Sequence, residues 1–293
     1  MDSSKYISIG ISIYNAESYL ENTIKCILNQ TFKKWELILI DDGSTDNSLK
    51  IAKDFAKNDK RIRVLSDGKN KKLAARLNQI IDESSYDYIA RMDADDLMAL
   101  DRLEKQVNFL EKNPNTDLVS TGILSIRNNL QLVGSRITNS NKKISLEDVI
   151  LGDTGIVHAS IIARKSWYIR NRYNEKLGIA QDYALWLHAF LKNDLKVGFI
   201  EEPLYFYREE ENIRLDKIIR AYDVQIKIIK DLDNNLILNI NKDKYISRLK
   251  KKKVLIKIVF LMKLNFILHK RRVDLKHNKE FMKVLNESLS LLV

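Results

Sequence analysis

The chain is poor in residues that crosslink or interrupt a fold: its 293 residues include one cysteine, two prolines and nine glycines. Cys26 alone forms no internal disulfide, and the opening MDSSKYISIG lacks a basic-then-apolar secretory segment, so we expect a reducing, cytoplasmic compartment. Collagen-like and disordered chains are excluded, because 45% of the residues are hydrophobic. The helical spacing of Cys26 with Ile24 and Ile27 predicts a thiol packed in the core.

Three common ligand-binding motifs are also missing from the sequence. The glycines never form G-x-G-x-x-G, which excludes the dinucleotide fingerprint. They never form G-x-x-x-x-G-K-[ST] either, which excludes the phosphate-binding P-loop. Cysteine and histidine show no zinc-ligand spacing.

The net positive charge of the chain comes from its C-terminal end. Residues 212–293 carry 20 Lys and Arg against 8 Asp and Glu, whereas residues 1–211 carry 30 against 31. A basic segment on a near-neutral body predicts an anionic, extended partner, either a membrane surface or nucleic acid. Because no RNA-binding or helix-turn-helix signature is present, we expect no nucleic acid.

The segment from Lys242 to Arg272 is rich in both lysine and apolar residues. Lys257 and Lys263 interrupt its apolar run, so it falls short of the roughly 18 uncharged residues that a membrane-spanning helix requires. As a helix it separates a lysine side from an apolar side made of Leu255, Val259, Met262 and Phe266. Such a basic amphipathic helix either lies on a membrane surface or packs its apolar side on the body, and the pattern leaves both open.

The first hundred residues alternate between strand and helix patterns. Strand patterns cover residues 7–13, 35–40, 61–65 and 86–92. Helical patterns lie between them, near residues 20–28, 49–56 and 73–81. The order βαβαβαβ predicts an α/β fold with a mostly parallel central sheet and helices on both faces. Ligands of such a sheet bind at the carboxyl ends of the strands.

The second hundred residues are less regular, which predicts a smaller, mixed half. The predicted elements are a helix at 101–112, a strand at 117–126, a hairpin through Asn128-Asn129, a strand at 156–163, a helix at 182–192, and short strands at 195–200 and 204–207. We place the one boundary near Glu210. It separates a domain at 1–210, with halves 1–100 and 101–210, from a basic helical extension at 211–293.

Carboxylates follow two of the predicted strands. Asp41 and Asp42 end one, and Asp93, Asp95 and Asp96 end another. Clustered carboxylates repel one another unless a cation or hydrogen-bond donors neutralise them. Oxygen ligands favour Mg²⁺ or Mn²⁺, which keeps positions open for substrate phosphates when the protein supplies one or two ligands. The pattern therefore predicts a site for a divalent ion and a diphosphate, although each cluster alone also suits a loop or helix cap.

Taken together and in order, the motifs resemble the family 2 glycosyltransferases of GT-A fold, particularly bacterial enzymes that build surface polysaccharides. The matching segments are SIGISIYNAESYL, ILNQTFKKWELILIDDGSTDNS, LAARLNQII, YIARMDADD, and AQDYALWLHAF with LYFYR. They cover roughly residues 5–210. The resemblance implies a catalytic domain whose first half binds a nucleotide-sugar and whose second half faces the acceptor. It says nothing about the extension.

For the nucleoside, the resemblance implies five residues in this chain. Ser12, Tyr14 and Glu17 would line the pocket, with Tyr14 near the base. Asp42, together with Asp41, would bind the edge of a uracil-like base. The implied donor is therefore a UDP-sugar.

For the phosphates and metal, the resemblance implies four more residues. Arg76 would either pair with a phosphate or hold the carboxylate loop. Asp93 would contact the ribose or the metal's water shell, and Asp95 would ligate Mn²⁺ or Mg²⁺ directly. Asp96 matches a frequent third carboxylate with a structural role.

For the acceptor side, Asp182 in AQDYALW matches the family's general base, which takes the proton of the attacking hydroxyl. Gln181 stands where the family usually has Glu, so the role of that Glu is open in this chain. His158 and Trp186 would lie on the acceptor side, or serve the core instead. Arg208 would approach the diphosphate, or form an ion pair.

The function expected from the resemblance is metal-dependent, inverting transfer of a hexose or N-acetylhexosamine from a UDP-sugar. The acceptor would be a saccharide or lipid-linked saccharide in O-antigen or capsule synthesis, and the enzyme would be peripheral on the inner face of the cell membrane. One alternative is a sugar-nucleotide pyrophosphorylase, although SIGISIYNAE lacks the Gly-rich basic loop that typically opens such enzymes. The other is a non-catalytic protein that binds membrane or nucleic acid.

Overall fold

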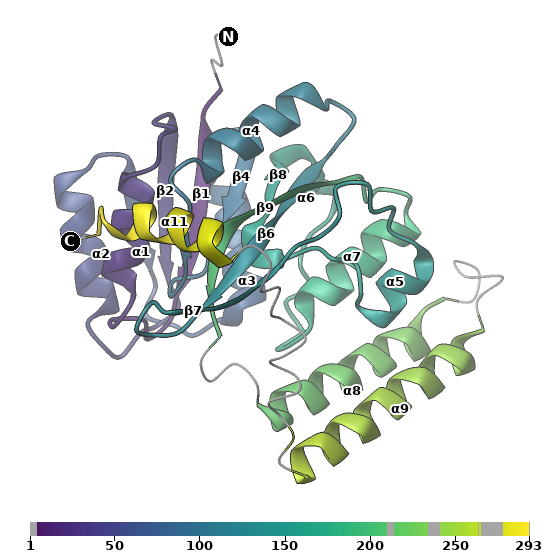
Figure 1. Cartoon of the computed structure of the whole chain (residues 1–293). Helices are drawn as coiled ribbons and strands as arrows, with labels where there is room; N and C mark the ends of the chain where they lie inside the picture. The colour runs from purple at the N-terminus through teal and green to yellow at the C-terminus, as the bar shows by residue number, and fades with distance from the viewer. Residues whose placement is uncertain (1–4, 210–213, 234–240, 263, 265–277, 293) are drawn as a thin grey trace.

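The computed structural model describes residues 5–209, 214–233, 241–262, 264 and 278–292 (Figure 1). The strands are β1 Ile7–Ile13, β2 Trp35–Asp41, β3 Ile62–Ser66, β4 Tyr88–Arg91, β5 Leu97–Met98, β6 Leu118–Ile126, β7 Leu132–Arg136, β8 Ile162–Arg164 and β9 Val197–Arg208. The helices are α1 Leu20–Leu28, α2 Ser48–Asn58, α3 Lys72–Glu83, α4 Arg102–Lys112, α5 Leu146–Leu151, α6 Lys165–Arg170, α7 Gln181–Leu191, α8 Leu215–Asp231, α9 Lys242–Leu261 and α11 Asn278–Leu289.

The described strands form one sheet in the order β3-β2-β1-β4-β8-β6-β9-β5, with β7 paired to β6. β3, β2, β1 and β4 are mutually parallel. β8 then pairs antiparallel with both β4 and β6, and β5 pairs antiparallel with β9. The predicted α/β fold, with a parallel first half and a mixed second half, is confirmed.

Strand β2 shows why helices cover both faces of the sheet. Every residue of WELILID is buried. Leu37 and Leu39 belong to one hydrophobic cluster, and Ile38 and Ile40 to the other. Side chains of a strand alternate between its faces, so a strand that is buried at every position requires a core on each side.

The pairing of β6 with β9 differs from the sequence prediction. We expected two short strands at 195–200 and 204–207, but β9 is one strand of 12 residues. Its register shifts around Gly122, which pairs with Pro203. A Cβ atom on Gly122 would lie 2.5 Å from the carbonyl oxygen of Glu201, so this glycine permits the close approach of the two strands. The bulge absorbs the proline without ending the strand.

The prediction of a strand at 156–163 is also largely wrong. A 3₁₀ turn at His158–Ser160 occupies its centre, and β8 begins at Ile162. Ser160 explains the turn, because its hydroxyl donates to the carbonyl of Val157 at 3.0 Å and accepts the N–H of Thr121 at 3.1 Å. Local side-chain bonding of this kind competes with a strand.

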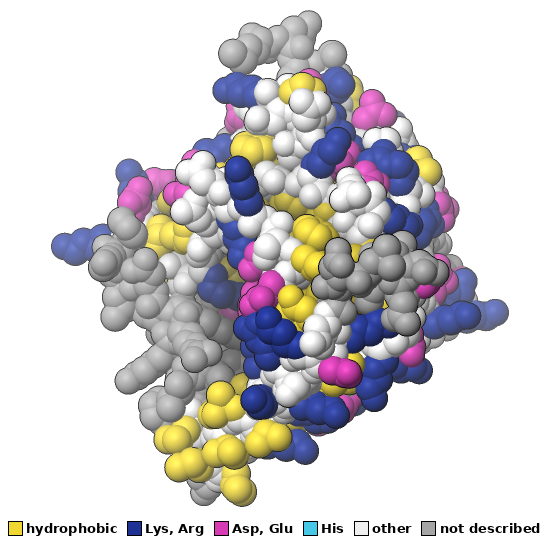
Figure 2. All heavy atoms as spheres, turned by 90° about the vertical axis from the view of Figure 1, so that its right-hand side faces the viewer, with side chains coloured by type: hydrophobic (Ala, Val, Ile, Leu, Met, Phe, Trp, Pro, Cys, Tyr) yellow, Lys and Arg dark blue, Asp and Glu magenta, His cyan; other side chains and the backbone are white. Residues whose placement is uncertain are grey.

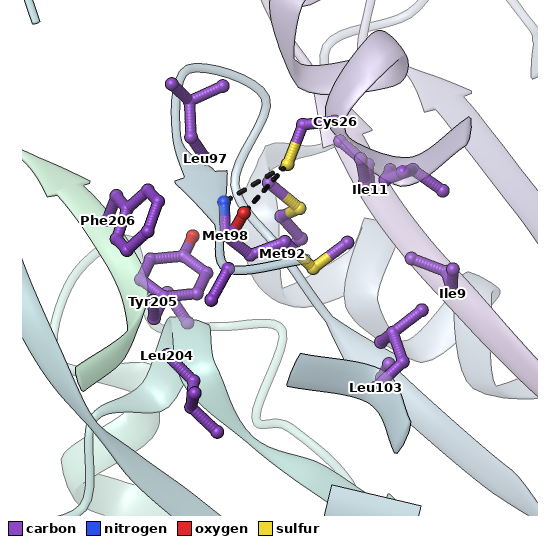
Figure 3. Packing of buried hydrophobic residues seen from close by; sticks show 14 of the residues in the cluster. Ile9, Ile11, Cys26, Met92, Leu97, Met98, Leu103, Leu204, Tyr205 and Phe206 are labelled. Atoms are coloured by element: carbon purple, nitrogen blue, oxygen red, sulfur yellow. Dashed lines mark hydrogen bonds between the residues drawn. The ribbon is translucent and has the colours of Figure 1, made fainter. Parts of the chain in front are cut away.

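Cys26 packs in the core, as predicted. Its sulfur donates to the carbonyl of Met98 and accepts the N–H of the same residue, at 3.3 and 3.2 Å (Figure 3). Burial raises the pKa of the thiol to about 12. The thiol therefore anchors the short strand β5 beneath α1 and remains protonated at neutral pH.

The C-terminal helices pack on both sides of the body. α8 and α9 lie side by side, and Ile229 and Leu249, both fully buried, join the cluster of α5 to α7 (Figure 1). α11 lies far from them, against α1, where Phe281 and Leu285 enter the other cluster. Both helical pieces of the extension thus complete the core.

The C-terminal half of α9 exposes an apolar stripe, made of Val254, Leu255, Ile258, Leu261 and Met262. Its residues follow one side of the helix, and Leu261 is 83% exposed. In Figure 2 hydrophobic side chains gather at the lowest part of the surface, with lysine and arginine side chains above them. Of the apolar side predicted from sequence, Leu255 and Met262 belong to the stripe, and Phe266 lies outside the described residues. No helix in the described ranges is long and apolar enough to cross a membrane.

Candidate active site

Two cavities adjoin at the edge of the sheet where β1, β2 and β4 end. The strand-end cavity, of about 430 Å³, is lined by Ser12, Tyr14, Asp42, Asp93 and Asp95 among others. The helix cavity, of about 400 Å³, is lined by Asp182, Tyr183 and Trp186 of α7 and by residues of α8, among others. Tyr207 and Lys217 line both cavities. The predicted position of a ligand site, at the carboxyl ends of the strands, is therefore where the structure has its strand-end cavity.

The loop after β1 is tied to the loop after β2. Asn15 has a left-handed backbone, with φ of 50°, and its side-chain oxygen accepts the N–H of Thr45 at 2.8 Å. Glu17 accepts both the backbone N–H and the side-chain amide of Asn47 at 2.9 Å. Tyr14, 53% exposed, projects from this loop at the cavity. Ser12 and Tyr14 line the strand-end cavity, whereas Glu17 is not among the lining residues and connects the two loops.

Asp42 and Arg76 shape the wall of this cavity together. The Asp42 carboxylate accepts the N–H groups of Lys71 and Lys72, at 2.7 and 3.1 Å, and the Nε–H of Arg76 at 2.8 Å. Arg76 is fully buried and also donates to Asp67 at 2.6 Å. We expected Arg76 either to pair with a phosphate or to hold a loop that carries carboxylates. The geometry matches the second role, since Arg76 holds Asp42 in the loop after β2.

Asp41 lies beside this wall but not on it. It is 1% exposed, accepts the N–H of Ser44 at 3.1 Å and the hydroxyl of Ser66 at 2.9 Å, and is not among the residues that line the cavity. Its carboxylate joins the ends of β2 and β3. Asp42 is therefore the member of the pair that faces the strand-end cavity.

Asp93, Asp95 and Asp96 lie on a turn after β4. β4 ends at Arg91, so Asp93 and Asp95 are on the turn and not on the strand, and the N–H of Asp96 donates to the carbonyl of Asp93. Both carboxylates nevertheless line the strand-end cavity. Arg91 donates to Asp93 at 2.8 Å. Burial, with the adjacent charge of Asp93, raises the pKa of Asp95 to about 6.

The C-terminal end of β9 holds this turn in place. Asp96 accepts the hydroxyl of Tyr205 at 2.6 Å and the N–H of Arg208 at 2.8 Å, which explains its burial. The Arg208 guanidinium donates to the carbonyls of Asp95 and Asn128, and lies 4.8 Å from the ring centre of Tyr19. Arg208 is 3% exposed and lies beneath the turn, not among the cavity-lining residues.

Asp182 lines the helix cavity from the first turn of α7. Ala180 precedes the helix in the left-handed region, with φ of 58°. The Asp182 carboxylate accepts the N–H of its neighbour Tyr183 at 2.8 Å, and the described residues give it no further hydrogen bond. A carboxylate that faces a cavity in this way is available to accept a proton from a bound ligand.

The other residues expected on the acceptor side have different positions. Trp186 lines the helix cavity and also stacks on Trp167, with ring centres 5.8 Å apart, so it serves both cavity and core. His158 bonds the hydroxyl of Tyr173 at 2.7 Å and packs edge-on against Trp186, behind the cavity wall. Burial and the charge of Arg91 hold the pKa of His158 well below its usual range. Gln181 begins α7 and is not among the lining residues.

Sequence reasoning missed several lining residues. Tyr19, Asn70, Lys72 and Leu73 join the strand-end cavity. Tyr207 also lines the cavity; it belongs to the matching segment LYFYR, but the resemblance gave it no role. Lys217 lines the cavity as well, although it belongs to the extension at 211–293, about which the resemblance says nothing. The left-handed backbone of Lys72, with φ of 72°, has no sequence signal in a lysine.

The donor set for a metal is small. Within the described ranges, no group of three or more His, Cys, Asp or Glu side chains is gathered so as to hold a metal ion. Asp93 and Asp95 bring two carboxylates to one cavity. Arg91 pairs with Asp93, whereas the described ranges give Asp95 no ion pair. The pair fits a hard divalent cation that takes its remaining ligands from phosphate and water.

This sheet topology, with carboxylates on the turn after β4, is that of a GT-A glycosyltransferase. A model of glycosyl transferase family 2 matches residues 8–183, and the chain belongs to this family. The family expected from the motifs is thereby confirmed.

Two proteins with similar sequences are named as glycosyltransferases. The chain is 38% identical over 216 residues to EpsE of Bacillus subtilis (strain 168), which is named as a glycosyltransferase. The matched residues are 72% of this chain and 76% of EpsE. It is 29% identical over 197 residues to WfgD of Escherichia coli, a UDP-Glc:alpha-D-GlcNAc-diphosphoundecaprenol beta-1,3-glucosyltransferase, with 66% and 74% of the two chains covered.

Solved structures agree in fold. S. aureus TarS in complex with UDP-GlcNAc superposes with a TM-score of 0.63 at 17% identity, over 98% of this chain and 82% of that one. The mannosyltransferase PcManGT from Pyrobaculum calidifontis, in complex with GDP-Man and Mn²⁺, gives a TM-score of 0.58 at 14% identity, over 99% and 86%.

Proposed function

We propose that the protein is a metal-dependent, inverting glycosyltransferase that moves a hexose or N-acetylhexosamine from a UDP-sugar to a saccharide acceptor. The observation that carries this proposal is the pair of adjoining cavities, one holding Asp93 and Asp95 and the other Asp182. Such a transfer needs a site for a charged diphosphate next to a site where a hydroxyl loses its proton.

The strand-end cavity would hold the donor. Tyr14 offers an exposed ring to a base, and Ser12 and Asp42 offer polar atoms on the same wall. The resemblance assigns the base edge to Asp42, and the neighbours TarS and PcManGT are named as complexes with nucleotide-sugars. UDP is the donor nucleotide that we propose for this chain.

Asp95 would ligate Mn²⁺ or Mg²⁺, with Asp93 beside it. When bound, the metal supplies positive charge that stabilises the departing diphosphate. In the transfer, the acceptor oxygen forms a bond to the anomeric carbon, and the bond from that carbon to the diphosphate breaks, leaving its electron pair on the diphosphate oxygen. Asp182 takes the proton of the attacking hydroxyl from the face opposite the leaving group.

The helix cavity would hold the acceptor, a saccharide or lipid-linked saccharide in surface-polysaccharide synthesis such as that of O-antigen or capsule. WfgD is named for a diphosphoundecaprenol-linked acceptor, which supports a lipid-linked one here. Trp186 supplies an aromatic wall of the kind that sugars pack against. His158, which packs edge-on against Trp186, would act through this wall, and Gln181 would act beside its neighbour Asp182.

The apolar stripe of α9 would place the enzyme on the inner face of the cell membrane. Five exposed apolar side chains on one side of a helix form a surface that can enter a lipid interface. Exposed Lys250, Lys251 and Lys257 lie on the same helix, and each lysine near an anionic surface contributes about 1 kcal/mol. The division into a catalytic domain at 1–210 and an extension at 211–293 remains part of this proposal.

Ligand-induced stabilisation tests the donor assignment. Melting temperatures of the full chain are measured with UDP, GDP and UDP-sugars, each with and without Mn²⁺. Because a ligand that binds the folded state raises its stability, UDP and UDP-sugars should raise the melting temperature more with Mn²⁺ than without it. A rise with UTP and sugar 1-phosphate, accompanied by pyrophosphate release, would instead identify a pyrophosphorylase.

A further inference from the structure

We infer that Lys217, on the first turn of α8, binds the diphosphate of the donor and stabilises the leaving group. This inference rests on the proposed function. Lys217 lies outside residues 8–183, the part that the family model matches. It is the cation among the described residues that lines both cavities, and the other residue common to both is Tyr207.

The body fixes the position of Lys217. Ile226 and Ile229 bury one side of α8, and Lys253 of α9 forms an ion pair with Asp223. Ile218 and Ala221 line the helix cavity from the same side of α8 as Lys217. The helix therefore presents a lysine to the cavities from a packed element.

The ion pairs of the strand-end cavity do not involve Lys217. Of its three carboxylates, Asp42 and Asp93 have arginine partners in Arg76 and Arg91, and the described residues give neither these two nor Asp95 an ion pair with Lys217. The Lys217 ammonium has no ion pair within the described ranges and is exposed. A lysine without a carboxylate partner remains free to bind an anion from the ligand.

A second cavity lysine lies in a different place. Lys72 belongs to the loop that Asp42 holds by its backbone, and lines the strand-end cavity alone. The donor's diphosphate lies between its nucleoside and the sugar that meets the acceptor, so it belongs at the junction of the cavities. Lys217 is at that junction. As the bond to the anomeric carbon breaks, negative charge grows on the diphosphate oxygen, and an ammonium there stabilises it.

The test compares nucleotides with and without the second phosphate. Lys217→Met keeps the length of the side chain and removes its charge, Lys217→Arg keeps the charge, and Lys227→Met is the matched control on the exposed side of α8. Calorimetric titration of the full chain with UDP and with UMP, both in Mn²⁺, measures affinity. Lys217→Met should weaken UDP binding about tenfold and UMP binding far less, since hydrogen bonds to charged groups contribute at about that scale. Lys217→Arg should restore part of the loss, and Lys227→Met should match the wild type.

Two results would overturn the inference. If Lys217→Met binds UDP as well as the wild type, the lysine does not contact the diphosphate. If UDP and UMP weaken equally, the effect is one on cavity structure. Failure of the wild type to bind any nucleoside diphosphate would reject the proposed function itself, which distinguishes the two failures.

Discussion

Three residues at the two cavities have left-handed backbones without being glycine. Asn15, Lys72 and Ala180 have φ of 50°, 72° and 58°, and each lines a cavity. Such conformations cost on the order of 1 kcal/mol or more for a residue with a Cβ atom, and they persist where surrounding contacts impose them. Here the bonds of Asp42 to the Lys72 loop and of Asn15 to Thr45 impose two of them. The cavity walls are therefore built before any ligand arrives.

At the scale of one residue, Asp95→Asn should abolish metal-dependent transfer and weaken UDP binding in Mn²⁺. Asp42 and Asp93 each pair with an arginine, whereas Asp95 has no ion pair within the described ranges, and the neutral amide of asparagine lacks the charge that attracts a hard cation. UDP titration with and without Mn²⁺ measures the effect. Asp87→Asn is the control, because Asp87 is exposed at the opposite end of β4. Normal turnover with unchanged metal dependence in the Asp95 variant would refute the metal assignment.

The sequence predicted which residues would share the strand-end cavity, because these residues lie in short motifs at strand ends. Ser12, Tyr14, Asp42, Asp93 and Asp95 all reach the strand-end cavity. Roles that depend on tertiary contacts were not visible. Whether Arg208 meets a diphosphate or the carbonyl of Asp95 depends on how β9 passes under the turn after β4.

At the scale of the element, the approach of β6 to β9 depends on Gly122. Gly122→Ala should destabilise the protein by about 1–3 kcal/mol, the usual cost of overpacking, because its Cβ would meet the Glu201 carbonyl at 2.5 Å. Gly178→Ala is the control, since no atom lies within 4 Å of that Cβ position. Urea unfolding of both variants measures the difference. Equal stability of the two would mean that the strands separate easily at this point.

The apolar stripe of α9 gives a second prediction at this scale. Leu255→Glu with Ile258→Glu should lower binding to anionic vesicles about tenfold or more, because burial of such a side chain contributes about 1.5–3 kcal/mol. Ile169→Glu is the control, an exposed apolar residue on α6 that is 61% exposed. Vesicle flotation at two salt concentrations separates the apolar part of the attraction from the electrostatic part, because salt screens only the latter. Equal flotation of the two variants would reject the stripe as the anchor.

The elements themselves were predictable to different degrees. The parallel half of the sheet was predicted because each strand and helix has its own hydrophobic pattern, such as the almost continuous apolar run of WELILID. β9 was split in two by Pro203, because a proline inside a paired strand depends on a bulge opposite Gly122. Of the two possibilities left open for α9, packing on the body is observed where Leu249 is buried, whereas contact of the exposed side, which includes Leu261, with a membrane remains a proposal.

At the scale of the whole molecule, the two cavities are assembled from segments that are far apart in the chain. The end of β1 and the loops after β1, β2 and β4 supply much of the strand-end cavity, and α7 and α8 supply part of the helix cavity. Tyr207, at the end of β9, and Lys217, at the start of α8, connect them. In the proposed function, this arrangement separates donor binding from proton removal, so we expect that the two can be altered independently.

The Asp182→Asn variant tests this separation most directly, through its UDP affinity and its turnover with saturating donor. The account predicts UDP affinity within about twofold of the wild type and turnover lower by roughly 10²-fold, the usual scale for loss of a general base. Asp231→Asn, an exposed aspartate at the end of α8, is the control and should change neither quantity. Normal turnover in Asp182→Asn, together with loss of UDP affinity, would place Asp182 in the donor site and contradict the account.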